Sequence, residues 1–260
     1  MFLTECDSTN TRLKQLIAES QESRVESYLY TDYQTAGRGQ TGNGWESERG
    51  KNLLCSILVE SQKSKVESLF NLNAAVSVAV YRVIQSILCQ QSGLSAKRSI
   101  SKAVSIKWPN DIYWRDKKVA GILIENAIVG SEMKYSIAGI GLNVNQTEFR
   151  SDAPNPISLK QITGREFDIH ALMERLYKEV QKALDEDVWA EYKAKLYRKE
   201  GYWPFVEREV DSTPTMNAKH EAEGQFLARI EDVLPTGEIV LKDQQGTQRV
   251  YHFKQIRYIL

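Results

Sequence analysis

The most constraining feature of this sequence is a series of four strand-like segments between residues 104 and 144. They are separated by short turns at residues 109–110, 115–118 and 130–132. Parallel strands need crossover connections of about a dozen residues or more, so connections this short favour antiparallel pairing. The middle of the chain is therefore predicted to be an antiparallel β-meander.

Helical and strand patterns flank this meander. Apolar residues recur at helical spacing over residues 66–89, which predicts a long helix with a wide buried stripe. Further helices are expected at residues 8–19, 169–185 and 188–199, and further strands at 27–34 and 53–59. These elements predict an α+β fold, in which a mixed, largely antiparallel sheet is combined with helices.

The pattern changes after Gly201. Four short strand-like segments follow, at residues 226–231, 238–242, 249–253 and 256–259, and glycine-containing turns separate the first three. The stretch 207–223 before them is polar and is predicted to be a loop. We therefore expect a larger domain at residues 1–203 and a small β-barrel at 204–260.

Charge and cysteine content exclude several classes of protein. Lys+Arg and Asp+Glu both number 34, so bulk charge cannot hold this chain to nucleic acid. No stretch approaches the roughly 18 uninterrupted apolar residues of a membrane span, and residues 1–10 do not resemble a signal peptide. Cys6, Cys55 and Cys89 are odd in number and far apart, which indicates buried, reduced thiols. We expect a soluble protein of the cytoplasm.

A glycine cluster at residues 37–44 has several interpretations. It matches G-x-G-x-x-G, but the next predicted element is a strand, whereas a dinucleotide site requires a helix there. A Walker A loop fails because Gly44 to Gly50–Lys51 is one residue too long. A donor-rich loop that wraps an anion remains, and an ordinary hairpin loop is an equally good interpretation.

Two other segments have features of a functional site, but each also has an ordinary structural explanation. Residues 97–118 hold seven Lys or Arg against two Asp, which suits a polyanion such as ATP, although taken alone an exposed hairpin edge is favoured. Within this segment, Asn110 and Asp111 follow Pro109 where the chain is predicted to turn. Proline, asparagine and aspartate would form such a turn without any functional role. Gly139 and Gly141 share one face of a strand, where either a ligand or a packed helix could approach closely.

Signatures of other catalytic classes are missing from the sequence. His170, His220 and His252 form no H-E-x-x-H, and there is no G-x-S-x-G. The S-x-x-K match at Ser99–Lys102 is too short to carry weight. Neither a hydrolase with a histidine base nor a transition-metal site is therefore predicted.

Five motifs occur in an order that resembles the biotin protein ligases, or biotin–(acetyl-CoA-carboxylase) ligases. They are DSTN at 7–10, QTAGRGQTGNGW at 34–45, KWPND at 107–111, KKVAGILIE at 117–125 and GIGLNV at 139–144. The resemblance implies a class II synthetase-like catalytic domain followed by an SH3-like domain. It also implies a two-step reaction: biotin and Mg-ATP give biotinyl-5′-AMP and pyrophosphate, and biotin then passes to one lysine of a biotin carboxyl carrier domain.

The resemblance also assigns the site residues. Lys118 and Arg38 are expected to be catalytic, with Lys118 near the biotin carboxylate and the α-phosphate. The expected biotin site comprises Ser8, Thr9, Asn10, Gln34, Gly37, Arg38, Gly39, Gln40, Lys118, Gly139 and Gly141. The expected ATP and adenylate site comprises Asn43, Trp45, Asn110, Asp111, Lys118 and Asn143. Mg²⁺ is expected to be held mainly by phosphate oxygens, without a protein metal site.

Two departures from the family pattern refine this expectation. Gln40 stands where some relatives carry a second arginine, so retention of the adenylate must depend on other contacts. The first motif begins at Asp7, which leaves no room for the DNA-binding domain of repressor-type relatives, so a ligase-only form without specific DNA binding is expected. No membrane partner is expected either, because no apolar stretch is long enough to span a bilayer. The oligomeric state stays open. The alternatives are a lipoate or octanoate ligase or transferase, and a non-catalytic binding module.

Overall fold

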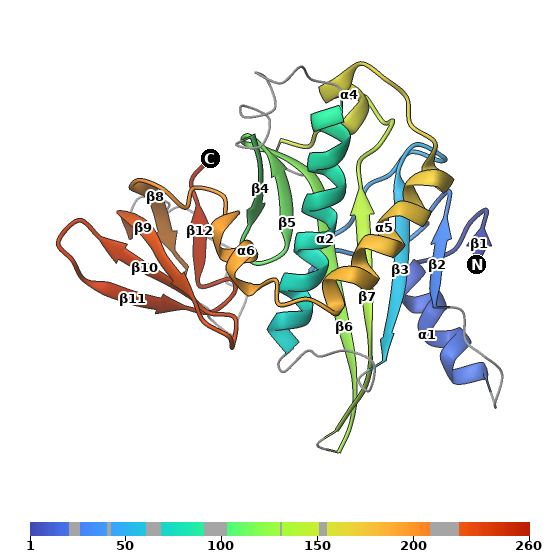
Figure 1. Ribbon diagram of the computed structural model, residues 1–260, viewed down its shortest axis with the longest axis horizontal. Coiled ribbons are helices and arrows are strands. Elements are labelled where there is room, and N and C mark those ends of the chain that lie inside the picture. The colour runs from blue at the N-terminus through green and yellow to red at the C-terminus, as the bar shows by residue number, and fades with distance from the viewer. Residues whose placement is uncertain are drawn as a thin grey trace, which may run out of the picture.

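The computed structural model describes residues 1–20, 27–40, 43–60, 69–90, 103–130, 132–150, 155–208 and 224–260. The described residues form a seven-stranded sheet with helices on both faces and, beside it, a five-stranded sheet (Figure 1). Several residues singled out in the sequence lie outside the described residues: Thr41, Gly42, Lys97, Arg98, Ser99, Lys102, His220 and most of the predicted loop at 207–223.

The large sheet has the strand order β1-β2-β3-β7-β6-β5-β4. Its strands are β1 (Phe2–Leu3), β2 (Tyr28–Thr31), β3 (Leu53–Glu60), β4 (Val104–Lys107), β5 (Asp111–Trp114), β6 (Lys117–Val129) and β7 (Glu132–Leu142). All neighbours pair antiparallel except β1 and β2, which are parallel. The meander predicted from the short turns is confirmed, as β4 to β7 lie side by side in chain order.

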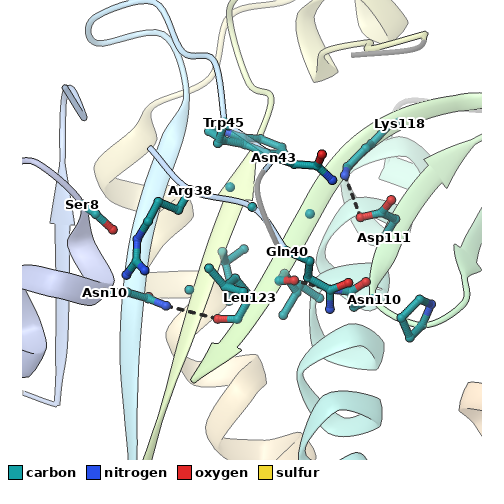
Figure 2. Close-up of a pocket in the computed structure, with 18 of the residues that line it drawn as sticks. Ser8, Asn10, Arg38, Gln40, Asn43, Trp45, Asn110, Asp111, Lys118 and Leu123 are labelled. Atoms are coloured by element: carbon teal, nitrogen blue, oxygen red, sulfur yellow. Dashed lines mark hydrogen bonds and ion pairs between the residues drawn. The ribbon is translucent and has the colours of Figure 1, made fainter. Parts of the chain in front are cut away.

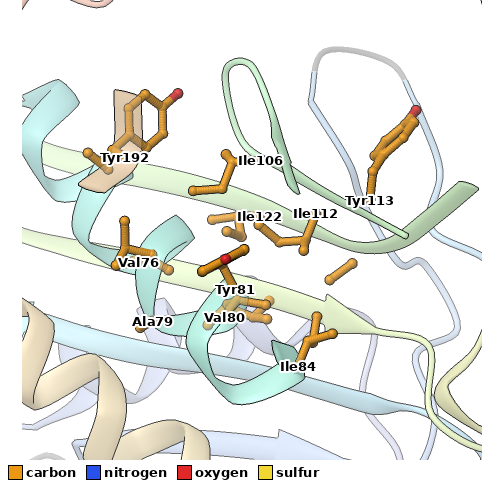
Figure 3. Packing of buried hydrophobic residues seen from close by; sticks show 14 of the residues in the cluster. Val76, Ala79, Val80, Tyr81, Ile84, Ile106, Ile112, Tyr113, Ile122 and Tyr192 are labelled. Carbon is orange, nitrogen blue, oxygen red and sulfur yellow. The ribbon is translucent and has the colours of Figure 1, made fainter. Parts of the chain in front are cut away.

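One face of this sheet packs against α2 (Leu69–Gln90) and α5 (Ile169–Leu184), as Figure 1 shows. Ala79, Val80 and Ile84 of α2 meet Ile112 and other branched side chains of the sheet in a common core (Figure 3). Among the described residues, α2 is the one helix whose length and hydropathy would suffice for a membrane span. Because 72% of that stretch is buried within the protein, it is the central core helix.

The opposite face of the sheet carries α1 (Thr9–Glu19). Leu13 of this helix packs with Leu29 and Ile137 in a second, smaller apolar cluster. Side chains alternate along β7, so Gly139 and Gly141 share the face of Ile137, away from α2. This glycine-lined area beside α1 is the floor of the site described below.

Two short helices complete the larger unit. The first, α4 (Leu159–Thr163), was not predicted; it carries a capping box in which Ser158 and Gln161 bond reciprocally. The second, α6 (Trp189–Ala194), is shorter than the expected helix at 188–199. It ends early because the following residues pair with the edge of β4: the Ile106 N–H donates to the Lys195 carbonyl, and the Tyr197 N–H donates to the Ile106 carbonyl.

The second sheet has the order β11-β10-β9-β8-β12 and fits an SH3-like domain. Its strands are β8 (Trp203–Glu207), β9 (Gln225–Val233), β10 (Ile239–Asp243), β11 (Gln248–Tyr251) and β12 (Ile256–Tyr258). Four of them were predicted, and β8 was not. Buried residues of both sheets belong to one continuous core, and the Trp108 indole N–H donates to the Gly237 carbonyl at 2.9 Å. The small sheet therefore abuts the β4–β5 side of the large one.

Candidate active site

The motif segments converge on one cavity of about 260 Å³. This volume lies near the lower end of the range of about 300–1,000 Å³ typical of small-molecule sites. Figure 2 shows side chains from α1, the glycine loop, β6 and the β4–β5 turn around the same space. The lining comprises Ser8, Thr9, Asn10, Gln34, Arg38, Gly39, Gln40, Asn43, Gly44, Trp45, Cys55, Lys107, Trp108, Pro109, Asn110, Asp111, Lys118, Gly121, Ile122, Leu123, Gly139, Ile140, Gly141 and Phe253.

The N-terminus of α1 supplies one polar end of the cavity. Ser8 is the N-cap residue, but its side chain makes no capping hydrogen bond and lines the cavity instead. Thr9 donates its backbone N–H and its hydroxyl to Oε1 of Gln34, at 2.8 and 3.1 Å. Because Oε1 of Gln34 is fixed toward α1, its Nε2 donors lie on the side of Gly37, where the glycine loop begins.

A buried hydroxyl and a carboxylate order this end. Ser56 Oγ lies 2.7 Å from Thr9 Oγ1 and 2.6 Å from Asn10 Oδ1, in a position with no solvent exposure. The Asn10 amide nitrogen donates to Glu125 Oε2 at 2.7 Å, and Arg38 Nη2 donates to the same oxygen at 3.1 Å. These contacts tie α1, β3, β6 and the glycine loop together.

Three glycines form the floor of the cavity. A Cβ on Gly139 would lie 2.4 Å from Asn10 Oδ1, and a Cβ on Gly141 would lie 2.4 Å from Cε2 of Trp45. Gly121, which pairs with Gly141 across β6 and β7, would bring its Cβ within 2.9 Å of the Trp45 ring. The packed-helix alternative therefore holds for Gly139, which Asn10 of α1 covers, whereas Gly121 and Gly141 are covered by the loop tryptophan, which neither alternative named.

The described part of the glycine loop folds back as a hairpin. The Trp45 N–H donates to the Gly37 carbonyl at 2.9 Å, and the Gly39 N–H donates to the Asn43 carbonyl at 2.7 Å. Among the described residues the buried Trp45 Nε1 has no hydrogen-bond partner. A buried N–H without an acceptor is costly, so this group is available to an acceptor on a ligand.

Positive charge gathers at the other end of the cavity. Lys118 Nζ lies 2.7 Å from Asp111 Oδ1, and Figure 2 shows this pair across the cavity from Asn10 and Arg38. Arg38 is paired with Glu125 at the opposite end, so the charged lining residues at this end are the cations Lys107 and Lys118 and the carboxylate of Asp111. An excess of one positive charge at this end of a small cavity favours an anionic ligand.

The smaller sheet contributes one wall. Phe253, in the connection between β11 and β12, lines the cavity and meets Trp108 edge to face with the ring centroids 6.2 Å apart. Trp108 is nearly fully buried, whereas 43% of Phe253 is exposed. The cavity mouth is therefore shared between the two sheets.

The cysteine thiols do not provide a nucleophile here. Cys55 lines the cavity, and burial raises the pKa of its thiol to about 12, so it stays protonated at neutral pH. Cys6 and Cys89 are only half-buried, in contrast to the expectation that all three thiols are buried. All three are free.

Most of the expected site residues meet in this cavity, but two do not line it. Gly37 stands at the start of the glycine loop and faces the backbone of its other strand, where a Cβ would be 2.6 Å from the Trp45 carbonyl oxygen. Asn143 is buried, and its amide donates to the carbonyls of Lys118 and Ile157 at 3.4 and 3.3 Å. It therefore supports the strand that carries Lys118, and its expected place beside adenine stays a prediction.

Several lining or supporting residues were not expected. Lys107 and Trp108 stood within a motif, and their order in the sequence already placed them beside Asn110. Glu125 likewise stood within a motif, as the last residue of the segment 117–125. Ser56 and Phe253 carried no usable signal, because their partners, Asn10 and Trp108, lie far away in the chain. The basic segment divides into two parts, as Lys107 and Lys118 line the cavity while Arg115 and Lys117 are exposed at the hairpin.

The cavity offers few donors for a metal ion. In the part of the chain that the structure describes, no three His, Cys, Asp or Glu residues gather as a metal site. Asp111 and Asn110 offer one carboxylate and one amide oxygen beside the cationic end. Such a sparse set of hard oxygens fits Mg²⁺ that is carried mainly by phosphates and water.

Comparison with known proteins was made for both sequence and fold. The model of the Biotin/lipoate A/B protein ligase family matches residues 3–143. The bifunctional ligase/repressor BirA of Escherichia coli (strain K12) is 26% identical over 204 residues, which cover 78% of this chain and 55% of that protein. The biotin–(acetyl-CoA-carboxylase) ligase of Mycobacterium tuberculosis is 29% identical over 153 residues, covering 59% of this chain and 52% of that protein. The chain therefore spans about half the length of these relatives.

The fold has a clear match among solved structures. The biotin protein ligase of Aquifex aeolicus in complex with biotin and ATP superposes with a TM-score of 0.72 at 23% identity. The match covers 100% of this chain and 98% of the other. Both the large sheet with its helices and the small SH3-like sheet are therefore shared with that protein.

Proposed function

The chain belongs to the biotin/lipoate A/B protein ligase family, and on that premise we propose that it is an ATP-dependent biotin–protein ligase. It activates biotin to biotinyl-5′-AMP and transfers the biotinyl group to one lysine of a biotin carboxyl carrier domain. The similarity to a Mycobacterium tuberculosis protein named as a biotin–(acetyl-CoA-carboxylase) ligase supports this choice within the family.

One observation carries the proposal: motifs as far apart in the chain as those of Ser8 and Gly141 line a single small cavity with a polar, donor-rich end and a cationic end. Thr9, Asn10 and Gln34 surround the first end, and Lys118 stands at the second. A cyclic urea at one end of a ligand and a carboxylate joined to phosphates at the other would match this distribution of donors and charge.

The roles of the residues follow from the chemistry of the first step. A carboxylate oxygen attacks the α-phosphorus, so two anions must be brought together. Lys118, at the cationic end, would offset this repulsion and the charge that develops on the phosphoryl oxygens. Arg38 holds the glycine loop to β6 through Glu125, which keeps the loop over the bound adenylate.

The nucleotide would lie between the loop and the β4–β5 turn. The Trp45 ring, supported on Gly121 and Gly141, offers an aromatic surface for the adenine, and its unpartnered Nε1 can donate to an acceptor. Asn110 and Asp111 would face the ribose and phosphates. Mg²⁺ would neutralise phosphate charge and be held mainly by phosphate oxygens, with Asp111 as the nearest protein carboxylate.

The second step needs no protein nucleophile. The acceptor lysine of the carrier attacks the acyl carbon of the adenylate, and AMP leaves. A thiol kept protonated at Cys55 and the absence of a catalytic triad from the sequence agree with direct transfer.

The test is incorporation of labelled acid by the purified chain. With ATP, Mg²⁺ and a biotin carboxyl carrier domain, labelled biotin should become attached to the carrier, and biotin should stimulate exchange of pyrophosphate into ATP. A carrier whose acceptor lysine is replaced by arginine is the control. Incorporation of lipoate or octanoate in place of biotin would assign the chain to the other branch of the family. Binding of the carrier without incorporation of any acid would identify a non-catalytic module.

A further inference from the structure

Lys107 is a second lysine of the cavity that has no anionic partner of its own. It is the last residue of β4 and lines the same space as Lys118. No hydrogen bond or ion pair of its ammonium is found among the described residues. Its Nζ lies instead 5.1 Å from the centroid of the Tyr113 ring and 5.2 Å from that of Tyr258.

The local charge is unbalanced. Burial lowers the pKa of Lys107, and the carboxylate of Asp111 acts in the opposite direction. The same carboxylate is already in contact with Lys118 Nζ at 2.7 Å. Two ammonium groups therefore depend on one carboxylate, and an anionic ligand that reached both would remove the imbalance.

The two tyrosine rings hold Lys107 in place from different sheets. Tyr113 belongs to β5, and Tyr258 belongs to β12 of the SH3-like sheet. Tyr258 is buried, and its hydroxyl has no hydrogen-bond partner among the described residues. No hydrogen bond of the hydroxyl holds the Tyr258 side chain in place. Its ring instead faces the Lys107 ammonium and packs against the Phe205 ring, with the centroids 4.9 Å apart.

We propose that Lys107 is a second catalytic cation, which binds the β- and γ-phosphates of ATP, and that Tyr258 is a positioning residue that holds Lys107 in place. This inference rests on the proposed function and adds a role for the SH3-like sheet in the first half-reaction. Lys118 acts at the α-phosphate, and Lys107 acts on the leaving group.

The bond changes show why a second cation helps. One carboxylate oxygen of biotin forms a bond to the α-phosphorus, and the bond from that phosphorus to the oxygen bridging to the β-phosphate breaks. The electron pair of the broken bond remains on that oxygen, so negative charge accumulates on pyrophosphate as it departs. A poorly hydrated ammonium fixed beside those oxygens stabilises that charge more than one in open solvent.

The role is specific to one half-reaction, and this makes it testable. Pyrophosphate leaves in adenylate formation and is absent from transfer. Lys107→Met removes the charge and keeps the length of the side chain. It should slow biotin-dependent exchange of pyrophosphate into ATP by roughly a hundredfold and raise the KM for pyrophosphate. Transfer of biotin from supplied biotinyl-5′-AMP to the carrier should be unchanged, which also shows that the variant is folded.

Matched variants separate charge from packing. Lys117→Met removes the same charge from an exposed neighbouring position outside the cavity, and should leave both half-reactions as in the unaltered chain. Lys107→Arg, which keeps the charge, should recover most of the exchange. Tyr258→Leu should slow exchange by about tenfold with transfer unaffected, because a desolvated cation–π contact is lost. Tyr258→Phe, which restores the ring without the hydroxyl, should restore exchange.

The outcomes that overturn the inference are distinct from failure of the proposed function. If the unaltered chain shows no biotin-dependent exchange, the ligase function itself fails. If it exchanges normally and Lys107→Met stays within about twofold of it, Lys107 does not contact the leaving group. Equal losses in exchange and transfer would likewise remove Lys107 from this role, since a general structural effect would then explain them.

Discussion

Lys118 Nζ and Asp111 Oδ1 lie 2.7 Å apart, so the cation expected at the α-phosphate is already engaged by a carboxylate. The two residues come from adjacent antiparallel strands, β6 and β5, next to a register shift in their pairing. Asp111 thereby fixes the lysine at the cavity wall. Phosphate oxygens that enter the site must share Lys118 with Asp111 or displace it, which couples nucleotide binding to this ion pair.

Loss of Lys118 should abolish most adenylate formation. Lys118→Ala removes a charge directed at a developing phosphoryl transition state, for which about 2.7–4 kcal/mol, or a hundredfold or more in rate, is expected. Biotin-dependent exchange of pyrophosphate into ATP measures it directly, with Lys117→Ala as the control at the exposed neighbouring residue. Near-normal exchange in a folded Lys118→Ala variant would remove Lys118 from the mechanism.

The two floor glycines should affect different substrates. A methyl group on Gly139 collides with Asn10, and one on Gly141 collides with the Trp45 ring. Gly139→Ala should therefore weaken biotin binding, whereas Gly141→Ala should weaken ATP binding; displacement of a packed neighbour typically costs about 1–3 kcal/mol. Isothermal titration with each substrate separates the two effects.

Gly44→Ala is the matched control for this pair. Its Cβ would meet nothing closer than the Gly37 carbonyl oxygen at 3.8 Å, so both affinities should stay close to those of the unaltered chain. If Gly139→Ala and Gly141→Ala weakened both substrates equally, the assignment of the two ends of the cavity would be wrong.

Arg82 should make stability depend on pH. This α2 residue contacts three carboxylates, at 3.2 Å from Glu179, 2.7 Å from Glu186 and 2.5 Å from Glu191. Hydrogen bonding to Arg82 lowers the pKa of Glu186. The contribution of Glu186 to stability is therefore present above its unfolded pKa of about 4.3 and is lost as pH falls through its lower folded pKa.

Removing Arg82 tests the predicted direction of this pH dependence of stability. Arg82→Ala leaves three neighbouring carboxylates without their cation and should lower the free energy of unfolding at pH 7 by about 2 kcal/mol. The difference from the unaltered chain should shrink as pH falls through the lowered pKa of Glu186. Urea denaturation at several pH values gives the measurement. A difference that stayed constant or widened on acidification would show that the charges are not responsible.

The contact between the two sheets should have a measurable strength. Trp108→Phe removes the N–H that donates to the Gly237 carbonyl at 2.9 Å and should lower the free energy of unfolding by about 1–2 kcal/mol. Trp203→Phe removes a similar bond, to the Glu200 carbonyl at 2.8 Å, but at an exposed position. It should change stability by less than about 0.5 kcal/mol. Equal effects of the two substitutions would mean that the Trp108 bond contributes nothing beyond a surface contact.

The sequence was most informative where structure is local. The turns at 109–110, 115–118 and 130–132 left antiparallel pairing as the simple solution, and β4 to β7 pair in that way. Strand β8 was missed because Pro204 and the polar stretch after it give no alternating pattern. The end of α6 was misplaced because pairing of residues 195–197 with β4 is a tertiary contact that overrides helical periodicity.

The site shows the same limit. The glycines at 139 and 141 predicted that something approaches the strand closely, but not that Asn10 and Trp45 do so. Motifs could nominate Lys118 and Asp111 because these residues stand within the recognised segments. Phe253 and Tyr258 could not be nominated, because their relevance arises only when a separate sheet docks beside β4.

The wall that the small sheet contributes to the cavity, through Phe253, is synthesised last, which affects the order in which the site forms on the ribosome. During translation, residues 8–141 are synthesised well before Phe253 and Tyr258. They include the α1 donors, the glycine loop, the floor glycines and both cavity lysines. Domains generally begin to fold as they emerge, N-terminal part first. A nascent chain can therefore present an open, one-sided cavity whose Lys107 still lacks half of its aromatic support. Synthesis of β12 completes this wall, so under the proposed function efficient formation of the acyl-adenylate would begin only after the small sheet has docked.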